Sequence, residues 1–192
     1  LQGLKKKQYA PVYLLMGEEP FFIDQISKYI EENVIDEANR DFNQAILYGK
    51  DTDSAEILAN VKEFPFGSPY RVVIVKEAQD LHALDSLKLY AEKPSENAIL
   101  VLCVKYKKLR AELYKPFEKK GIVFLSEKIK DNKLPEWILE QSKNYEFKMN
   151  LNTAKMLAEH IGNDLSLINS EFLKLRITLP AGTEITPQII ER

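Results

Sequence analysis

The sequence lacks the features that define several protein classes. It has one cysteine, Cys103, inside the apolar run AILVLCV, so no intramolecular disulfide can form, and a small core residue in a reducing compartment is expected. No apolar stretch approaches the roughly 20 residues that a membrane-spanning helix requires. The start LQGLKKKQY has no apolar region behind it that would make a signal peptide. These absences predict a soluble, cytoplasmic protein without membrane contact.

A charge excess and a metal-binding pattern are also missing. The 27 basic and 29 acidic side chains nearly cancel, so no global charge favours nucleic acid or an anionic membrane, and such a contact would have to be local. His82 and His160 have no cysteine or histidine at ligand spacing, so we expect no metal site.

Short β-branched or aliphatic runs alternate with helical patterns in the first two thirds of the chain. Helices are expected to begin at Pro20 and after Asp53, and to cover about 80–92 and 107–119. Several of the runs are apolar on both faces, which a parallel sheet covered by helices on each side requires. The sequence therefore predicts an α/β fold with five parallel strands at 11–16, 42–48, 71–75, 98–104 and 121–125.

The strand signal ends near residue 130, and three helical segments follow. Gly162 suits the residue after the second of these helices, and Asp164 or Asn163 can cap the third. We therefore expect an α/β domain over 1–140 and a small all-α domain over 141–192. Thr186 and Pro187 resemble a helix start with few residues after it, which favours a longer natural chain.

The stretch YLLMGEEPFFIDQISKYI has the strand, glycine turn and helix of a phosphate-binding loop without its chemistry. Gly17 fills the first position of GxxxxGK[ST], but Phe22, Ile23 and Asp24 stand where the second glycine, the lysine and the hydroxyl residue belong. After the third strand, Lys76 replaces the carboxylate that would hold Mg²⁺. Either a nucleotide site has decayed here, or the fold never carried one.

Several stretches, in order, resemble the delta subunit family of the bacterial DNA polymerase III clamp loader. They run through nearly the whole chain and read PVYLLMGEEPFFID, EFPFGSPYRVVIV, KLRAELYKPFEKKGIVFLSEKIKDNKLPEWI and GNDLSLINSEFLKL. The resemblance implies an AAA+-like α/β domain with a degenerate nucleotide site, then a helical lid domain. In the lid pattern GxDxR, Ser166 stands at the arginine position. The family's third, C-terminal oligomerisation domain would lie beyond this chain.

The resemblance also implies a function. Family members bind and open the ring-shaped sliding clamp, the beta subunit, for loading on primed DNA during replication. The fuel comes from sister subunits, the gamma/tau ATPases, which assemble with delta prime. The resemblance therefore implies a component of the DNA polymerase III holoenzyme. We expect this component to have no cofactor and no catalytic activity of its own.

The family holds the clamp with a short hydrophobic pair just before the third strand. Here that stretch is EFPFGSPYR, in which Phe66 matches the second member and Pro65 or Phe64 the first. Many relatives have an aliphatic residue beside the aromatic one, so the proline leaves open whether Phe64 substitutes. The competing interpretation is that Phe64 and Phe66 pack under their own helix.

Three further interpretations concern a DNA contact and two other classes of function. The basic stretch KYKKLRAELYKPFEKK at 105–120 could contact DNA phosphates, but such a run is more often a solvated face. The alternative function is an active ATPase that uses atypical phosphate-binding residues. A phosphoryl-receiver domain would need an aspartate where Lys76 stands.

Overall fold

A computed structural model describes residues 2–190 and divides the chain into two compact units. The first unit extends to Glu127 and the second begins at Lys128. This division lies earlier than the boundary expected after residue 140. The reason is that helix α7 (Leu134–Asn144) packs against α8 (Leu151–Ile161) and so belongs wholly to the second unit. The assignment of the second unit as a lid domain stays a prediction.

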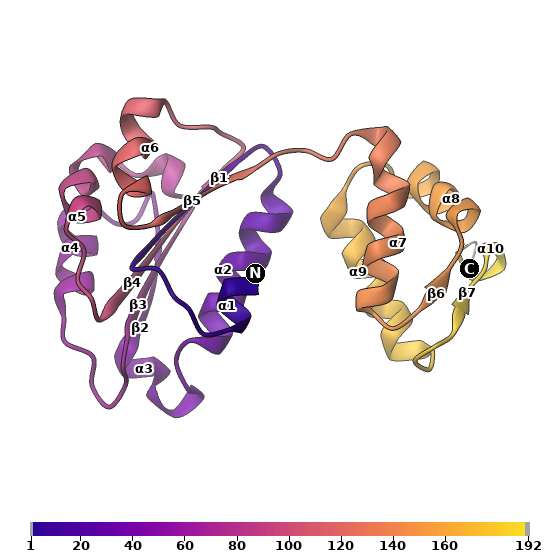
Figure 1. Ribbon diagram of the computed structural model, residues 1–192, viewed down its shortest axis with the longest axis horizontal. Coiled ribbons are helices and arrows are strands. Elements are labelled where there is room, and N and C mark those ends of the chain that lie inside the picture. The colour runs from indigo at the N-terminus through magenta and orange to yellow at the C-terminus, as the bar shows by residue number, and fades with distance from the viewer. Residues whose placement is uncertain (1, 191–192) are drawn as a thin grey trace. The chain divides into compact units, whose positions relative to one another are not determined.

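The first unit is built on a parallel sheet of five strands, as the sequence predicts (Figure 1). All four strand pairings are parallel, and the spatial order is β2-β3-β4-β1-β5. Each strand matches one of the predicted apolar runs. Their bounds are β1 Val12–Gly17, β2 Gln44–Tyr48, β3 Arg71–Lys76, β4 Ala98–Lys105 and β5 Ile122–Ser126.

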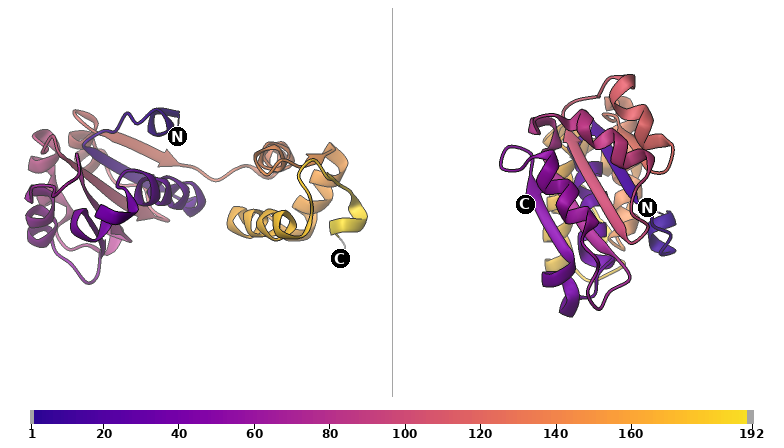
Figure 2. Two further views of the ribbon diagram at one scale, coloured as in Figure 1. Left: turned by 90° about the horizontal axis from the view of Figure 1, so that it is seen from below. Right: turned by 90° about the vertical axis from the view of Figure 1, so that its left-hand side faces the viewer.

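Helices cover both faces of this sheet, which confirms the predicted α/β class. Helices α4 (Ser54–Lys62), α5 (Lys88–Glu92) and α6 (Ala111–Glu118) lie on one face, and the right-hand view of Figure 2 looks onto this layer. Helices α1 (Gln2–Lys5) and α2 (Pro20–Asn33) lie on the other face. The central strands β1, β3 and β4 are almost completely buried, which explains why their sequences are apolar on both faces.

Two expected helices are shorter in the structure than in the sequence analysis. The 80–92 segment contains a 3₁₀ turn at Leu84–Leu87 before the short α5, because Ala83 adopts a left-handed conformation with φ of 58°. The 107–119 helix begins only at Ala111, since Tyr106 is also left-handed and Lys107 bridges to Gly17. Short 3₁₀ turns also lie at Glu37–Asn39, Ala78–Asp80 and Asp131–Lys133, and α3 spans Arg40–Asn43.

Three longer helices, a small sheet and a short helix lie in the described part of the second unit. Helices α7, α8 and α9 (Leu165–Thr178) enclose a core that includes Ile138, Ile168 and Phe172. Asp164 caps α9 by accepting the Leu167 N–H at 2.9 Å, as predicted. Strand β6 (Lys148–Met149) pairs in parallel with β7 (Glu184–Ile185), and α10 (Pro187–Ile190) follows. No helix among residues 2–190 has the length and apolar character needed to cross a membrane.

Cys103 gives a simple test of the packing in the first unit. Its side chain lies in β4 beside Leu15 of β1, and burial raises the pKa of the thiol to about 12. We expect native protein at pH 8 to react with a thiol reagent such as DTNB only slowly, and protein unfolded in urea to react at once. Rapid stoichiometric labelling of the native chain would contradict this packing.

The same thiol makes stability depend on alkaline pH in a defined direction. In the unfolded chain the thiol loses its proton near its ordinary pKa of 9.0, whereas the folded chain keeps it to about pH 12. The contribution to stability is therefore complete below pH 9 and is lost as the pH rises from 9 to 12. Urea denaturation of Cys103→Ala and the original chain at pH 8 and pH 10.5 measures this difference. The Ala variant is expected to lose less stability over that interval.

Candidate functional site

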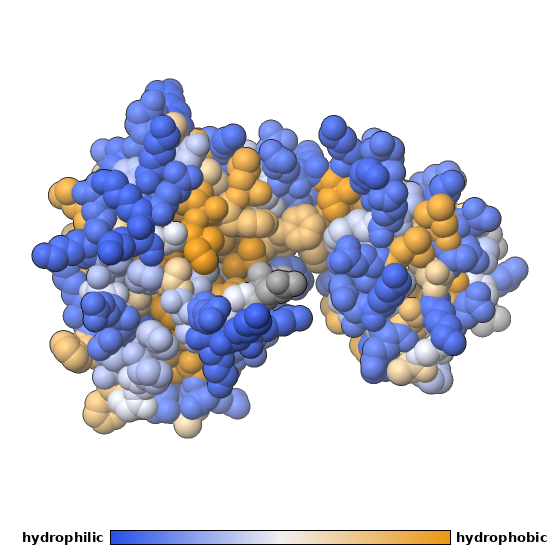
Figure 3. Space-filling model, in the orientation of Figure 1, coloured by the Kyte–Doolittle hydropathy of each residue, from blue (hydrophilic) through white to orange (hydrophobic). Residues whose placement is uncertain are grey.

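Three phenylalanine rings project into solvent at the amino edge of the sheet. The loop between α4 and β3 carries Phe64 and Phe66, which are 87% and 73% exposed. Phe42, just before β2, is 65% exposed. Figure 3 shows apolar side chains protruding at the lower end of this unit, where Figure 1 places that loop. The interpretation that Phe64 and Phe66 pack under their own helix is therefore wrong. We call these three rings the aromatic surface.

The buried side chain of Asn43 fixes the backbone of Phe66. The N–H of Phe66 donates to Asn43 Oδ1 at 2.7 Å, and Asn43 Nδ2 donates to the Phe66 carbonyl at 2.8 Å. The same Nδ2 donates to the Asn39 carbonyl at 2.9 Å. Asn43 is fully buried, so each of these bonds satisfies a polar group that would otherwise be costly to bury. The amide thus holds a loop residue 23 positions away in sequence.

Arg71, the first residue of β3, joins three segments below the same surface. Its guanidinium donates to the Phe42 carbonyl at 2.8 Å and to the Asn60 carbonyl and side-chain oxygen at 2.8 and 2.9 Å. It also pairs with the Glu63 carboxylate. Asn60 lies in the last turn of α4, where a cation complements the carbonyl end of the helix. Arg71 therefore holds both ends of the loop that carries Phe64 and Phe66.

The loop itself restricts the conformations of its rings. Gly67 has φ of 65°, a left-handed conformation that favours glycine, and it turns the chain directly after Phe66. Pro65 and Pro69 limit φ on either side of that turn. An apolar side chain that is already ordered loses little conformational entropy when a partner covers it.

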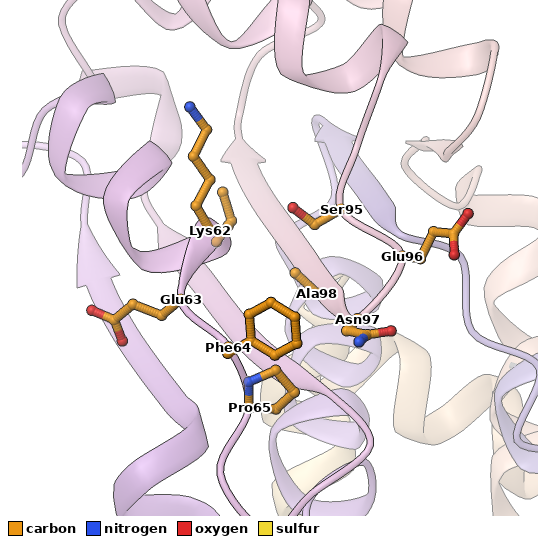
Figure 4. A pocket seen from close by; sticks show the side chains of 9 residues that line it. Lys62, Glu63, Phe64, Pro65, Ser95, Glu96, Asn97 and Ala98 are labelled. Carbon is orange, nitrogen blue, oxygen red and sulfur yellow. The ribbon is translucent and has the colours of Figure 1, made fainter.

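A shallow hollow of about 290 Å³ lies beside Phe64. Figure 4 shows Phe64 and Pro65 on one side of it and the Ser95–Ala98 segment on the other, with Lys62 and Glu63 pointing away. The aromatic surface is therefore edged by polar and charged side chains. An apolar centre with a polar rim is the usual composition of a protein interface.

The carboxyl edge of the sheet, at the other end of the strands, carries the turn between β1 and α2, where a phosphate-binding loop would lie. This turn is closed by Ser126 of β5, whose hydroxyl donates to the Glu19 carbonyl at 2.6 Å, while the Glu19 N–H donates to the Ser126 carbonyl at 3.3 Å. A Cβ on Gly17 would lie 2.0 Å from that carbonyl oxygen. The backbone that would surround a phosphate is thus packed against β5.

A carboxylate stands where an anion would bind. Glu19 precedes α2, is 6% exposed, and accepts the Phe21 N–H at 3.0 Å through Oε1. The N-terminus of a helix attracts anions, and here a side chain of the protein itself supplies the negative charge. A phosphate placed there would face the repulsion of a nearby like charge.

Two cations at this edge are paired within the protein. Lys76, at the position of the metal-binding carboxylate, forms an ion pair with Glu31 at 3.1 Å, and Lys105 pairs with Asp24 at 2.7 Å. In the second unit, Ser166 is exposed on α9 and carries no charge. The residues present therefore do not fit a Mg²⁺–nucleotide. Among residues 2–190, no group of three or more His, Cys, Asp or Glu side chains could hold a metal ion.

The basic stretch is divided by the structure. Lys105 and Lys119 form ion pairs with Asp24 and Glu92. The remaining cations are exposed and have no ion pair within the described residues; they are Lys107, Lys108, Arg110, Lys115 and Lys120. A solvated face and a phosphate contact are both compatible with this arrangement.

The sequence analysis did not identify Phe42 as part of the aromatic surface, or Asn43 and Arg71 as the residues that hold it. Phe42 was placed inside the second strand, but β2 begins at Gln44 and Phe42 lies in the short helix α3. Asn43 and Arg71 bond to residues 23 and 29 positions away, and no local pattern reveals such bonds. The one available signal was an asparagine and an arginine beside apolar runs, where a buried polar group needs a partner.

Comparisons with known proteins agree on one family. The family described as "DNA polymerase III, delta subunit" matches residues 13–127. The Bacillus subtilis DNA polymerase III subunit delta is 25% identical over 197 residues, covering 96% of this chain. The solved structure of the Bacillus subtilis DNA clamp loader delta protein matches 99% of the chain with a TM-score of 0.79 and 22% identity.

A more distant structure shares the fold. The RuvB Holliday junction branch migration motor of Thermotoga maritima matches 99% of the chain, and 63% of its own, with a TM-score of 0.55 and 14% identity. The chain spans 57% of the Bacillus subtilis subunit and 60% of the solved delta protein. The two solved structures are only 22% and 14% identical to the chain, so they show its AAA+-like fold and not its role.

The phosphate turn gives a direct prediction. Because Glu19, Asp24 and the closed turn oppose phosphate, isothermal titration with Mg-ATP is expected to show no binding heat up to about 1 mM, with Mg²⁺ alone as the blank. A dissociation constant in the micromolar range would contradict the account and would support the alternative of an ATPase with atypical residues.

Proposed function

The chain belongs to the DNA polymerase III delta subunit family, and from this premise we propose that it is a non-catalytic part of the clamp loader that binds and opens the sliding clamp. The observation that carries this proposal is the pair of exposed rings, Phe64 and Phe66, on a loop fixed by Asn43 and Arg71. By the family resemblance, Phe66 matches the second member of the family's hydrophobic pair, and Phe64 or Pro65 matches the first.

Burial of one of these rings would contribute substantially to the binding free energy. Burying one phenylalanine in an apolar pocket contributes roughly 1.5 to 3 kcal/mol, which is the size of an interface hot spot. Because the loop is already ordered, little of this energy is lost to ordering on binding. The proposed contact residues are Phe66 together with Phe64 or Pro65.

Opening a ring without ATP requires a difference between two affinities. A ligand that binds the open and closed clamp equally well shifts no population. Moving the ring from about 1% open to about 99% open requires roughly 10⁴-fold tighter binding to the open form. We propose that the rings reach a pocket better in the open clamp, while the gamma/tau ATPases provide the cycle that releases it.

Further partners follow from the same proposal. Delta prime and the gamma/tau subunits would assemble with the chain in the loader, around primed DNA. The exposed cations between Lys107 and Lys120 are available to DNA phosphates in that complex. The alternative, an active ATPase, has no support from the geometry at Gly17, Glu19 and Lys76.

Removal of the Phe66 ring tests the contact. In surface plasmon resonance against the immobilised beta clamp, Phe66→Ala is expected to bind about ten- to a hundredfold more weakly, since it loses one buried ring. Tyr106→Ala is the matched control, because Tyr106 is an aromatic residue 71% exposed at the opposite edge of the sheet. Equal binding of Phe66→Ala and the original chain would refute the contact.

A second pair of variants identifies the companion of Phe66. Phe64 is far more exposed than the half-buried Pro65, so Phe64→Ala is expected to weaken clamp binding more than Pro65→Ala does. The same resonance assay ranks the two. If Pro65→Ala loses more clamp affinity than Phe64→Ala and its melting temperature is unchanged, Pro65 is the contact residue beside Phe66.

A further inference from the structure

Phe42 lies on the aromatic surface although it comes from a different part of the chain. Its ring meets the ring of Phe66 edge to face, with centroids 6.0 Å apart and planes at 60°. Phe42 is still 65% exposed after this contact. Two aromatic rings thus stand together in solvent, each with most of its area uncovered, and neither belongs to the two core clusters of the unit.

Hydrogen bonds from buried polar side chains join helix α3, which carries Phe42, to the loop that carries Phe66. The carbonyl of Phe42 accepts a hydrogen bond from Arg71, directly after the loop. The next residue, Asn43, bonds to both backbone polar groups of Phe66. The backbone segments that carry Phe42 and Phe66 are therefore held together before any partner arrives.

Solvent exposure of this arrangement has a cost that the fold alone does not explain. Large apolar side chains that gather on a surface mark interaction sites, whereas single ones are common everywhere. The rings of Phe42, Phe64 and Phe66 stabilise no core, yet buried amide and guanidinium groups are used to position two of them. The expected occupant is an apolar pocket on a protein, and continuity with Phe66 points to the protein that binds Phe66.

Resting on the proposed function, we infer that Phe42 is a further contact residue for the sliding clamp and that Asn43 is the positioning residue that aligns Phe42 with Phe66. The clamp pocket must then receive two rings that meet edge to face. Phe42 comes from before β2, so the contact includes a second chain segment in addition to the loop before β3.

A double-mutant cycle tests the contact. Clamp binding is measured by surface plasmon resonance for the purified chain, Phe42→Ala, Phe66→Ala and the double variant, with Tyr106→Ala as control. Phe42→Ala is expected to bind about tenfold more weakly. The double variant is expected to lose less than the product of the two single losses, because each ring supports the other. Phe42→Leu, which keeps an apolar side chain, should recover part of the affinity.

The positioning role of Asn43 has its own readout. Asn43→Asp can still accept the Phe66 N–H but cannot donate to the Phe66 and Asn39 carbonyls. The buried carboxylate would face these two carbonyl oxygens without a proton between them, so we expect the loop to open more often. Hydrogen exchange at the Phe66 amide should then be faster and clamp binding weaker, while exchange at the Phe117 amide in the core stays unchanged. Phe42→Ala, at an exposed position, keeps the inference testable where Asn43→Asp fails to fold.

The outcomes separate this inference from the proposed function. Loss of binding for Phe66→Ala with full binding for Phe42→Ala overturns the role of Phe42 and leaves the clamp contact intact. Absence of clamp binding by the original chain overturns the proposed function and the inference with it. A dimer seen by analytical ultracentrifugation that Phe42→Ala dissociates, with unchanged clamp affinity, assigns the surface to a second copy and overturns the inference.

Discussion

The hydrogen bonds of one buried asparagine, Asn43, hold the loop that carries Phe66 at the amino edge of the sheet. They hold the backbone of Phe66 from inside, and the edge-to-face contact with Phe42 supports the ring itself. Arg71 adds a second set of bonds that joins the end of α4, the start of β3 and Phe42. Buried polar groups that satisfy one another can rigidify a surface whose side chains point outward. Rings ordered in this way are suited to binding.

The opposite edge of the same sheet differs from the amino edge, because its polar groups bind one another within the protein. The turn after β1 keeps the backbone course of a phosphate loop, but the protein's own charges satisfy each other there. Glu19 caps α2, Asp24 pairs with Lys105, and Lys76 pairs with Glu31. The core of this unit consists of apolar strands and helices and does not depend on a nucleotide. In the proposed function, the AAA+-like fold supports a binding surface at its amino edge.

The sequence predicts the core of the fold well and the site only in part. The five strands were recognisable because burial on both faces leaves continuous apolar runs, and caps such as Asp164 follow from short-range bonds. The left-handed Ala83, which shortens the expected 80–92 helix, has no signature, since an alanine there favours helix. Phe64, Pro65 and Phe66 were proposed as contact residues from the family resemblance, and this stays a prediction. Phe42 and Asn43 were missed because only the folded chain brings them to residues more than twenty positions away.

A structure of the chain bound to the beta clamp tests the central claim most directly, namely that a pre-ordered aromatic surface does the binding. The account predicts that the ring of Phe66 lies in an apolar pocket of the clamp and that Asn43 keeps both hydrogen bonds to the Phe66 backbone. A complex in which the clamp covers another face, with Phe64 and Phe66 left in solvent, would contradict it.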